Sequence, residues 1–250
     1  MNLRLPRKRC QVTLISGYCS GFGMVLCADT EESGGTYKGK VSKWSQFQMS
    51  DDWKVSVGGA GSASAIDRFV LLHRDKLQGI QTFDREKIVS ATEEAMRSVY
   101  ERYVWPVMPQ VDNSFQILLA MQARGGRQYL FSVREDLIPQ PQDLYAHAGI
   151  GESFAKYLTD RLMSTAIKLE TLGMKEDMVD LAVFITKQVK DSVPGVSGDT
   201  SLVRWNKDFS EDRYAAHAVS EMESEFSDFD GYFGNYWLSR GQPEKQNPRL

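Results

Sequence analysis

The order of strand-like and helix-like segments limits the folds open to this chain more than any other feature of its sequence. Strand-like apolar runs occupy Val12–Ile15, Met24–Ala28, Val41–Phe47, Trp53–Val57, Phe115–Met121, Gln128–Val133, Leu144–Ala148 and Asp199–Trp205. Helical apolar faces begin at Ile66, Ile88, Phe154 and Met178. The strands come in runs and the helices in consecutive pairs, which argues against alternating βαβ units. The sequence therefore predicts an α+β fold in which two stacked sheets are covered by helices.

Composition excludes several classes of protein. The 250 residues are 42% hydrophobic, enough for a real core, and the net charge of −3 provides no electrostatic basis for binding nucleic acid or a membrane surface. No signal peptide is visible, and no apolar run approaches the ~20 residues that a membrane span needs. Cys10, Cys19 and Cys27 are odd in number and form no C-x-x-C pair. A reducing cytoplasm is the predicted location.

Metal and classical hydrolase chemistry find no support in the motifs. His73, His147 and His217 lie far apart, and none has a cysteine or carboxylate nearby at ligand spacing. G-x-S-x-G, Walker A and H-E-x-x-H patterns are all missing from the sequence. We expect neither a metal nor a cofactor, and we interpret the histidines as helix-face or surface residues.

The stretch QVTLISGYCSGFGMVLCADTEES, residues 11–33, is typical of a β-hairpin, yet it contains two residues that a hairpin does not require. Asp29 is the first charge after an apolar run, and Thr13 stands in the first strand. A threonine hydroxyl becomes a useful nucleophile when a base removes its proton, and a free α-amine, with a pKa of about 7.7–8.0, can serve as that base. Thr13 is therefore either a β-branched strand residue or a nucleophile that has yet to be uncovered.

Several segments, in order along the chain, carry a resemblance to a known family. They are T-x-x-x-G followed by G-x-V-L-x-A-D-T, then Y-K-G-K-V-S-K-W, then V-x-V-G-G-A-G-S-A, and finally the turns AGIGESFAKYL and VSGDTSLV. Over residues 12–205 this pattern resembles the proteasome β-type family, and it is especially similar to the bacterial HslV-like peptidases. The resemblance implies a four-layer αββα sandwich of two antiparallel sheets flanked by helix pairs, the N-terminal nucleophile (Ntn) hydrolase fold.

The resemblance also implies a catalytic set. Asp29 follows Thr13 by 29 − 13 = 16 residues, the family's spacing between nucleophile and active-site aspartate. Lys43 matches the family's active-site lysine if the loop before it is two residues shorter. Gly61 matches the glycine whose N–H contributes to the oxyanion hole. Asp191 and Ser197 are accessory candidates for the remaining polar positions.

The chain departs from the family pattern around the nucleophile. Val12 precedes Thr13 where cleaved relatives usually have glycine or the initiator methionine, and twelve residues stand before Thr13. Ile150 occupies the place of a serine that helps with proton transfer. We expect three regions: 1–12 as an arm or propeptide, 13–205 as the αββα domain, and 206–250 as a C-terminal extension. The aromatic residues of the extension (Phe226, Phe229, Tyr232, Phe233, Trp237) are expected to pack on their own domain.

Two functions follow from this pattern. The first is a threonine endopeptidase in a homo-oligomeric ring, which would cleave unfolded polypeptides supplied by an AAA+ ATPase partner, as the resemblance implies. The second is a non-catalytic scaffold subunit that keeps the fold and an uncleaved N-terminus, as Val12 and Ile150 suggest. The sequence favours the peptidase.

Overall fold

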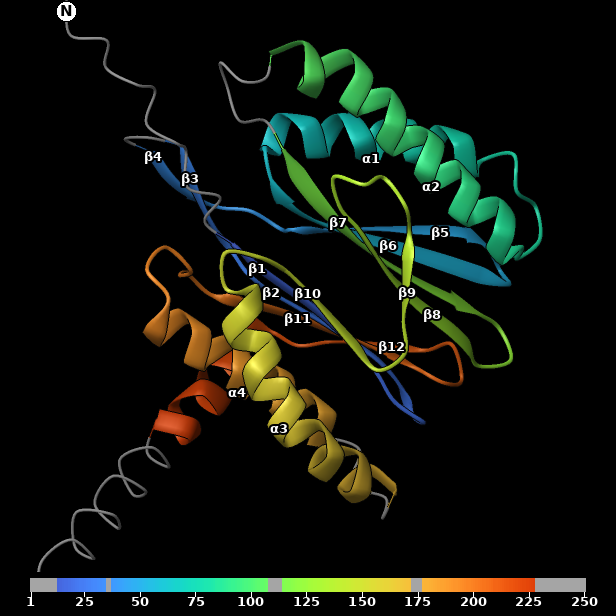
Figure 1. Ribbon diagram of the computed structural model, residues 1–250. Helices are drawn as coiled ribbons and strands as arrows, with labels where there is room; N and C mark the ends of the chain where they lie inside the picture. Colours follow the sequence, from blue (N-terminus) through green and yellow to red (C-terminus); the bar gives the residue numbers. More distant parts are fainter. Residues whose placement is uncertain (1–12, 35–36, 108–113, 172–176, 228–250) are drawn as a thin grey trace, which may run out of the picture.

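Two antiparallel five-stranded sheets stack on each other in the computed structural model, which describes residues 13–34, 37–107, 114–171 and 177–227 (Figure 1). One sheet has the strand order β10–β1–β2–β11–β12, and the other has the order β5–β6–β7–β8–β9. A separate two-stranded sheet pairs β3 with β4.

The runs of strands and pairs of helices occur along the chain in the predicted order. The strands are β1 (Leu14–Cys19), β2 (Gly23–Asp29), β3 (Glu31–Gly34), β4 (Tyr37–Lys40), β5 (Trp44–Ser50), β6 (Trp53–Gly61), β7 (Phe115–Ala123), β8 (Arg127–Val133), β9 (Gln140–Gln142), β10 (Tyr145–Gly149), β11 (Thr200–Asn206) and β12 (Glu211–Arg213). The helices are α1 (Ala63–Leu77), α2 (Arg85–Val99), the π-helix η1 (Tyr100–Val104), the 3₁₀ turn η2 (Trp105–Val107), α3 (Glu152–Thr171) and α4 (Asp177–Ser192). A further helix covers residues 216–227.

Three apolar layers hold the elements together. Helices α1 and α2 pack their apolar faces, with Phe69 and Ile88, on β5–β9. Helices α3 and α4 cover the other sheet, where Cys27 packs with Ile185. A third cluster, which includes Leu118, fills the space between the sheets. These layers confirm the predicted α+β sandwich of two antiparallel sheets with helices on both outer faces.

Two features of the fold were not expected from the sequence. Ser33, Gly34 and residues 37–40 belong to the paired strands β3 and β4, which were not predicted because the glycine-rich sequence around them weakens the periodic signal of a strand. Residues beyond 205 supply the edge strand β12 and the helix 216–227, whose Val219 and Phe226 pack in the cluster beneath α4.

Several sequence assignments fall outside the described residues. They include the N-terminal arm 1–12 and four of the five aromatic residues of the extension, namely Phe229, Tyr232, Phe233 and Trp237. The fifth, Phe226, makes an edge-on ring contact with Phe184 of α4 at 5.5 Å between centroids. None of the helices within the described ranges is long and apolar enough to cross a lipid bilayer.

The layer between the sheets gives a stability prediction. Leu118→Ala removes a fully buried side chain from that layer, and we expect the free energy of unfolding to fall by about 2–5 kcal/mol because a cavity remains. Denaturant unfolding measures this loss. The control is Leu71→Ala, at a side chain of α1 that is 54% exposed, which should change stability by less than about 0.5 kcal/mol. Equal losses in both variants would contradict this account of the core.

Candidate active site

Three of the residues expected to form the site meet at one end of the sandwich. Thr13 directly precedes β1, Asp29 ends β2, and Lys43 directly precedes β5 in the other sheet. The Lys43 ammonium donates a hydrogen bond to Thr13 Oγ1 and lies 2.8 Å from Asp29 Oδ2. The side chains of Lys43 and Asp29 are 7% and 0% exposed, so the pair is shielded from water. The cation is therefore placed on the threonine hydroxyl, with a carboxylate behind it.

The Asp29 carboxylate binds groups from three parts of the chain. Its Oδ1 accepts the backbone N–H of Leu14 at 2.7 Å, Oδ2 accepts from Lys43, and the backbone N–H of Ser197 also donates to the carboxylate. Burial raises the pKa of Asp29 above its ordinary value of 3.8, while Lys43 and the two backbone donors act in the opposite direction. Burial is the largest of these effects, so the ionised form of Asp29 depends on its hydrogen-bond partners.

The β1–β2 hairpin explains why Thr13 and Asp29 meet. Ile15 stands opposite Ala28 in the register, so the next position brings Leu14 to Asp29. Thr13 then lies one residue beyond the paired strand, beside the carboxylate. The spacing of 16 residues in the sequence is therefore a consequence of the hairpin register.

Gly61 lies at the end of β6 near the same end of the sandwich. Its φ is +123°, and a Cβ there would stand 2.5 Å from the carbonyl oxygen of Ser114. Two residues earlier, the N–H of Gly59 donates to the carbonyl oxygen of Lys43 at 3.3 Å. Strand β6 is thereby attached to Lys43, while the oxyanion role of the Gly61 N–H stays a prediction.

Gly149 and Gln116 complete the surroundings of Thr13. The sequence indicated Gly149 only as part of the turn AGIGESFAKYL, and it did not identify Gln116. Gly149 has a φ of +103°, and a Cβ there would stand 2.1 Å from the Thr13 carbonyl oxygen. The Gly149 N–H donates to Gln116 Oε1 at 3.3 Å, which links β10 to β7 of the other sheet. Gln116 is the one polar residue in the run FQILLAM, and that break in an apolar strand was the available signal.

The two accessory candidates have different surroundings. Ser197 lies against Asp29 through its backbone N–H, and its carbonyl accepts the N–H of Glu31 at 3.2 Å. The exposed Asp191 side chain instead forms an ion pair with Lys187 on its own helix, α4. Ile150 is 45% exposed in the turn before α3 and has no hydrogen-bonding side chain to offer. The structure therefore brings Ser197, but not Asp191, to the Asp29 carboxylate.

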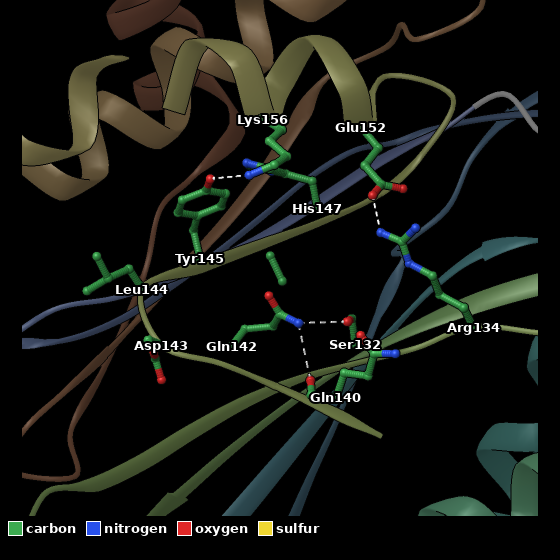
Figure 2. A pocket seen from close by; sticks show the side chains of 11 residues that line it. Ser132, Arg134, Gln140, Gln142, Asp143, Leu144, Tyr145, His147, Glu152 and Lys156 are labelled. Carbon is green, nitrogen blue, oxygen red and sulfur yellow. Dashed lines mark hydrogen bonds and ion pairs between the residues drawn. The ribbon is translucent and has the colours of Figure 1, made fainter. Parts of the chain in front are cut away.

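A pocket of about 480 Å³ lies elsewhere, between β8 and β9 on one side and β10 and α3 on the other (Figure 2). Its walls carry polar groups in mutual contact: Lys156 donates to the Tyr145 hydroxyl at 2.8 Å, and Gln142 donates to Ser132 at 3.0 Å. None of the residues predicted to form the site lines this pocket.

His147, on the wall of that pocket, has a structural role. The Thr159 hydroxyl donates to the Ala155 carbonyl at 2.9 Å, so it accepts from His147 Nε2–H, and His147 Nδ1 accepts from the Ser16 hydroxyl. Burial lowers the pKa of His147 to about 3, which keeps the ring neutral. Ser16 is fully buried and cannot be reached by a substrate.

The other histidine within the core is also structural. His73 bonds the hydroxyl of Thr92 at 2.9 Å between α1 and α2, and burial lowers its pKa to about 3. Among the described residues, no group of three or more His, Cys, Asp or Glu side chains is placed to hold a metal ion.

Among the comparisons with known proteins, only the comparison of structures finds a match. No model of a known protein family matches the chain, and no curated protein matches it in sequence. Solved structures match over nearly the whole chain. Anbu (ancestral β-subunit) from Yersinia bercovieri is similar with a TM-score of 0.70 at 15% identity, covering 95% of this chain and 100% of that one. The fold is that of the Anbu proteins.

Two further structures agree. A Gly-1 mutant of Anbu from Hyphomicrobium sp. strain MC1 has a TM-score of 0.69 at 16% identity, with 90% and 99% of the two chains covered. Anbu from Pseudomonas aeruginosa, solved as a helical assembly, has a TM-score of 0.69 at 14% identity, with 94% and 100% covered. The expected assignment to HslV-like peptidases is wrong, because these neighbours are Anbu proteins, a distinct family of proteasome-related fold.

The close approach of Gly149 to Thr13 gives a second stability prediction. Gly149→Ala would place a Cβ against the Thr13 carbonyl at a positive φ, so we expect a loss of about 1–3 kcal/mol in unfolding free energy. Chemical denaturation measures it. Gly21→Ala is the control, because nothing lies within 4 Å of its added Cβ. If Gly149→Ala were as stable as Gly21→Ala, the close approach of β10 to Thr13 would be contradicted.

Proposed function

We propose that this chain is a threonine peptidase of the N-terminal nucleophile class, with Thr13 as the nucleophile. The observation that carries the proposal is the buried Lys43 ammonium, which donates to Thr13 Oγ1 and is held by Asp29 at 2.8 Å. A cation on a hydroxyl oxygen favours the alkoxide that forms as the proton leaves. An ordinary strand threonine would not need a buried ion pair beside it.

The proposed reaction assigns one role to each residue. Once the Val12–Thr13 bond is cut, the free α-amine of Thr13 takes the hydroxyl proton as Oγ1 attacks the substrate carbonyl carbon. The Gly61 N–H stabilises the oxyanion, Lys43 stabilises the developing charge on Oγ1, and Asp29 orients Lys43. The leaving amine takes the proton from the α-amine, and water then hydrolyses the acyl ester on Thr13. Ser197 supports Asp29 through its backbone.

The proposal extends to assembly and partners. Anbu from Pseudomonas aeruginosa forms a helical assembly, which supports a homo-oligomer, in a ring or a helix, for this chain as well. The substrates of the present chain would be unfolded polypeptides or peptides, supplied by an AAA+ ATPase partner in the cytoplasm. Residues 1–12 would be the propeptide, 13–205 the αββα domain and 206–250 an extension.

A second candidate function is a non-catalytic scaffold subunit. Two observations favour it: the exposed Ile150 stands where the related pattern has a serine, and Asp191 pairs with Lys187 away from the nucleophile. In this alternative the buried Lys43–Asp29 pair would have only a structural role, in which it holds the ends of the strands in place.

Intact mass and labelling distinguish the two functions. The purified oligomer should lose residues 1–12, and an electrophile directed at N-terminal threonine should then label Thr13. Thr13→Ala should abolish both processing and labelling, whereas Thr171→Ala, at the exposed end of α3, should leave both unchanged. A full-length mass without labelling would refute the peptidase and leave the scaffold.

The acid limb of the labelling rate gives a second test. Protonation of the free α-amine, whose ordinary pKa is about 7.7–8.0, lowers the rate first. Lys43 is held by ionised Asp29, whose pKa is raised by burial, so a second fall in the rate should follow at a pH above the ordinary aspartate value of 3.8. A raised pKa means that the folded state binds this proton more tightly than the unfolded state does. Protonation of Asp29 therefore does not itself favour unfolding. The circular dichroism spectrum should stay unchanged over the pH range in which Asp29 becomes protonated. A second fall in the rate at or below pH 3.8 would contradict the assignment.

A further inference from the structure

A buried ionic contact joins the helix 216–227 to the strand beside Asp29. The Thr200 hydroxyl, at the start of β11, donates to Glu223 Oε1 at 2.5 Å. Lys190 of α4 donates to both carboxylate oxygens of Glu223, at 2.8 and 3.1 Å, and to Thr200 Oγ1 at 3.2 Å. Groups from α4, β11 and the helix 216–227 thus converge on one hydroxyl.

This contact is shielded from solvent. The side chains of Lys190 and Glu223 are 14% and 17% exposed, and Thr200 is 4% exposed. Removing one partner of a buried ion pair leaves an uncompensated charge, which is costly, so Glu223 is strongly held in place. Apolar packing of Val219 and Phe226 against the α4 layer holds the same helix.

Thr200 is the direct ladder partner of Asp29. The two residues stand opposite each other in the β2–β11 register. The segment leading into Thr200 is bound to the residues after Asp29, because Thr30 N–H donates to the Asp199 carbonyl at 2.9 Å and Glu31 N–H to that of Ser197 at 3.2 Å. The same segment supplies the Ser197 N–H that binds the Asp29 carboxylate.

We propose that Glu223 and Thr200 are positioning residues, which anchor the 197–200 segment so that the Ser197 N–H stays directed at the Asp29 carboxylate. Through Asp29 the anchor acts on Lys43 and then on Thr13. The helix 216–227 is therefore a part of the support of the site, although it lies in the region assigned to an extension. Its relevance to catalysis rests on the proposed function, whereas the anchoring itself does not.

Hydrogen exchange in the full chain tests the anchor without requiring any activity. Thr200→Val keeps the shape of the side chain and removes its hydroxyl, while Glu223→Gln removes the charge. We expect amide exchange in a peptide that covers Ser197 to accelerate about tenfold in both variants, as measured by mass spectrometry. Thr200→Ser keeps the hydroxyl and should restore the slow exchange.

Two controls separate anchoring from a general loss of stability. Glu94→Gln breaks an ion pair with Lys76 between α1 and α2, and it should leave exchange at Ser197 unchanged. Peptides covering the buried strand β7 should exchange at the wild-type rate in every variant. Unchanged exchange at Ser197 in Thr200→Val, equal acceleration in β7, or no rescue by Thr200→Ser would each overturn the proposal.

If Thr13 is labelled in the wild-type protein, peptide hydrolysis gives a second readout. Thr200→Val should then lower kcat about tenfold or more with little change in KM, because Thr200 supports the reacting groups and does not contact substrate. An unchanged kcat alongside faster exchange would overturn the link to catalysis. If the wild-type protein is never labelled, the proposed function fails, and the exchange result still decides whether the anchor exists.

Discussion

The end of the sandwich that carries Thr13 depends on how the buried Asp29 carboxylate is satisfied. A buried charge is costly unless it is paired and hydrogen-bonded, and Asp29 binds the Lys43 ammonium and the backbone N–H groups of Leu14 and Ser197. These partners come from the loop before β5, the start of β1 and the approach to β11. The ion pair and hydrogen bonds of this one carboxylate thus join both sheets at this point. Because such pairs add little net stability, the ion pair beside Thr13 supports the proposal that Thr13 is a nucleophile.

Close packing of the backbone around Thr13 is the second feature on which this end of the sandwich depends. Gly149 approaches the Thr13 carbonyl so closely that any side chain would collide with it, and Gly61 is confined in the same way by Ser114. Gln116 reaches across from the other sheet to bind Gly149. The two strand ends are therefore held by backbone contacts and by one amide, in a region where Ile150 can contribute no hydrogen bond. Thr13, Lys43 and Asp29 meet as the family pattern implied, whereas Asp191 lies away from them and Gln116 was not expected there.

The resemblance was informative about fold and misleading about family. Short motifs around Thr13, Asp29 and Lys43 reflect the geometry of a hairpin and a buried ion pair, which proteins of one fold share. They led to HslV-like peptidases, whereas solved structures that match nearly the whole chain, at 14–16% identity, are Anbu proteins. The motifs predicted the fold correctly because they follow from the hairpin register and the buried ion pair of that fold.

The sequence by itself determined the layers, because periodicity is a local property of the chain, and its resemblance to a known family implied that Thr13 and Asp29 belong to one site. It also indicated Lys43, through the motif that precedes β5. Only the tertiary structure decided that Gln116 meets Gly149 and that Glu223 reaches Thr200. Each of those contacts depends on how separate elements dock, which no local pattern encodes. The physical reason is that register is set between neighbours along a hairpin, whereas docking is set by the packing of the complete core.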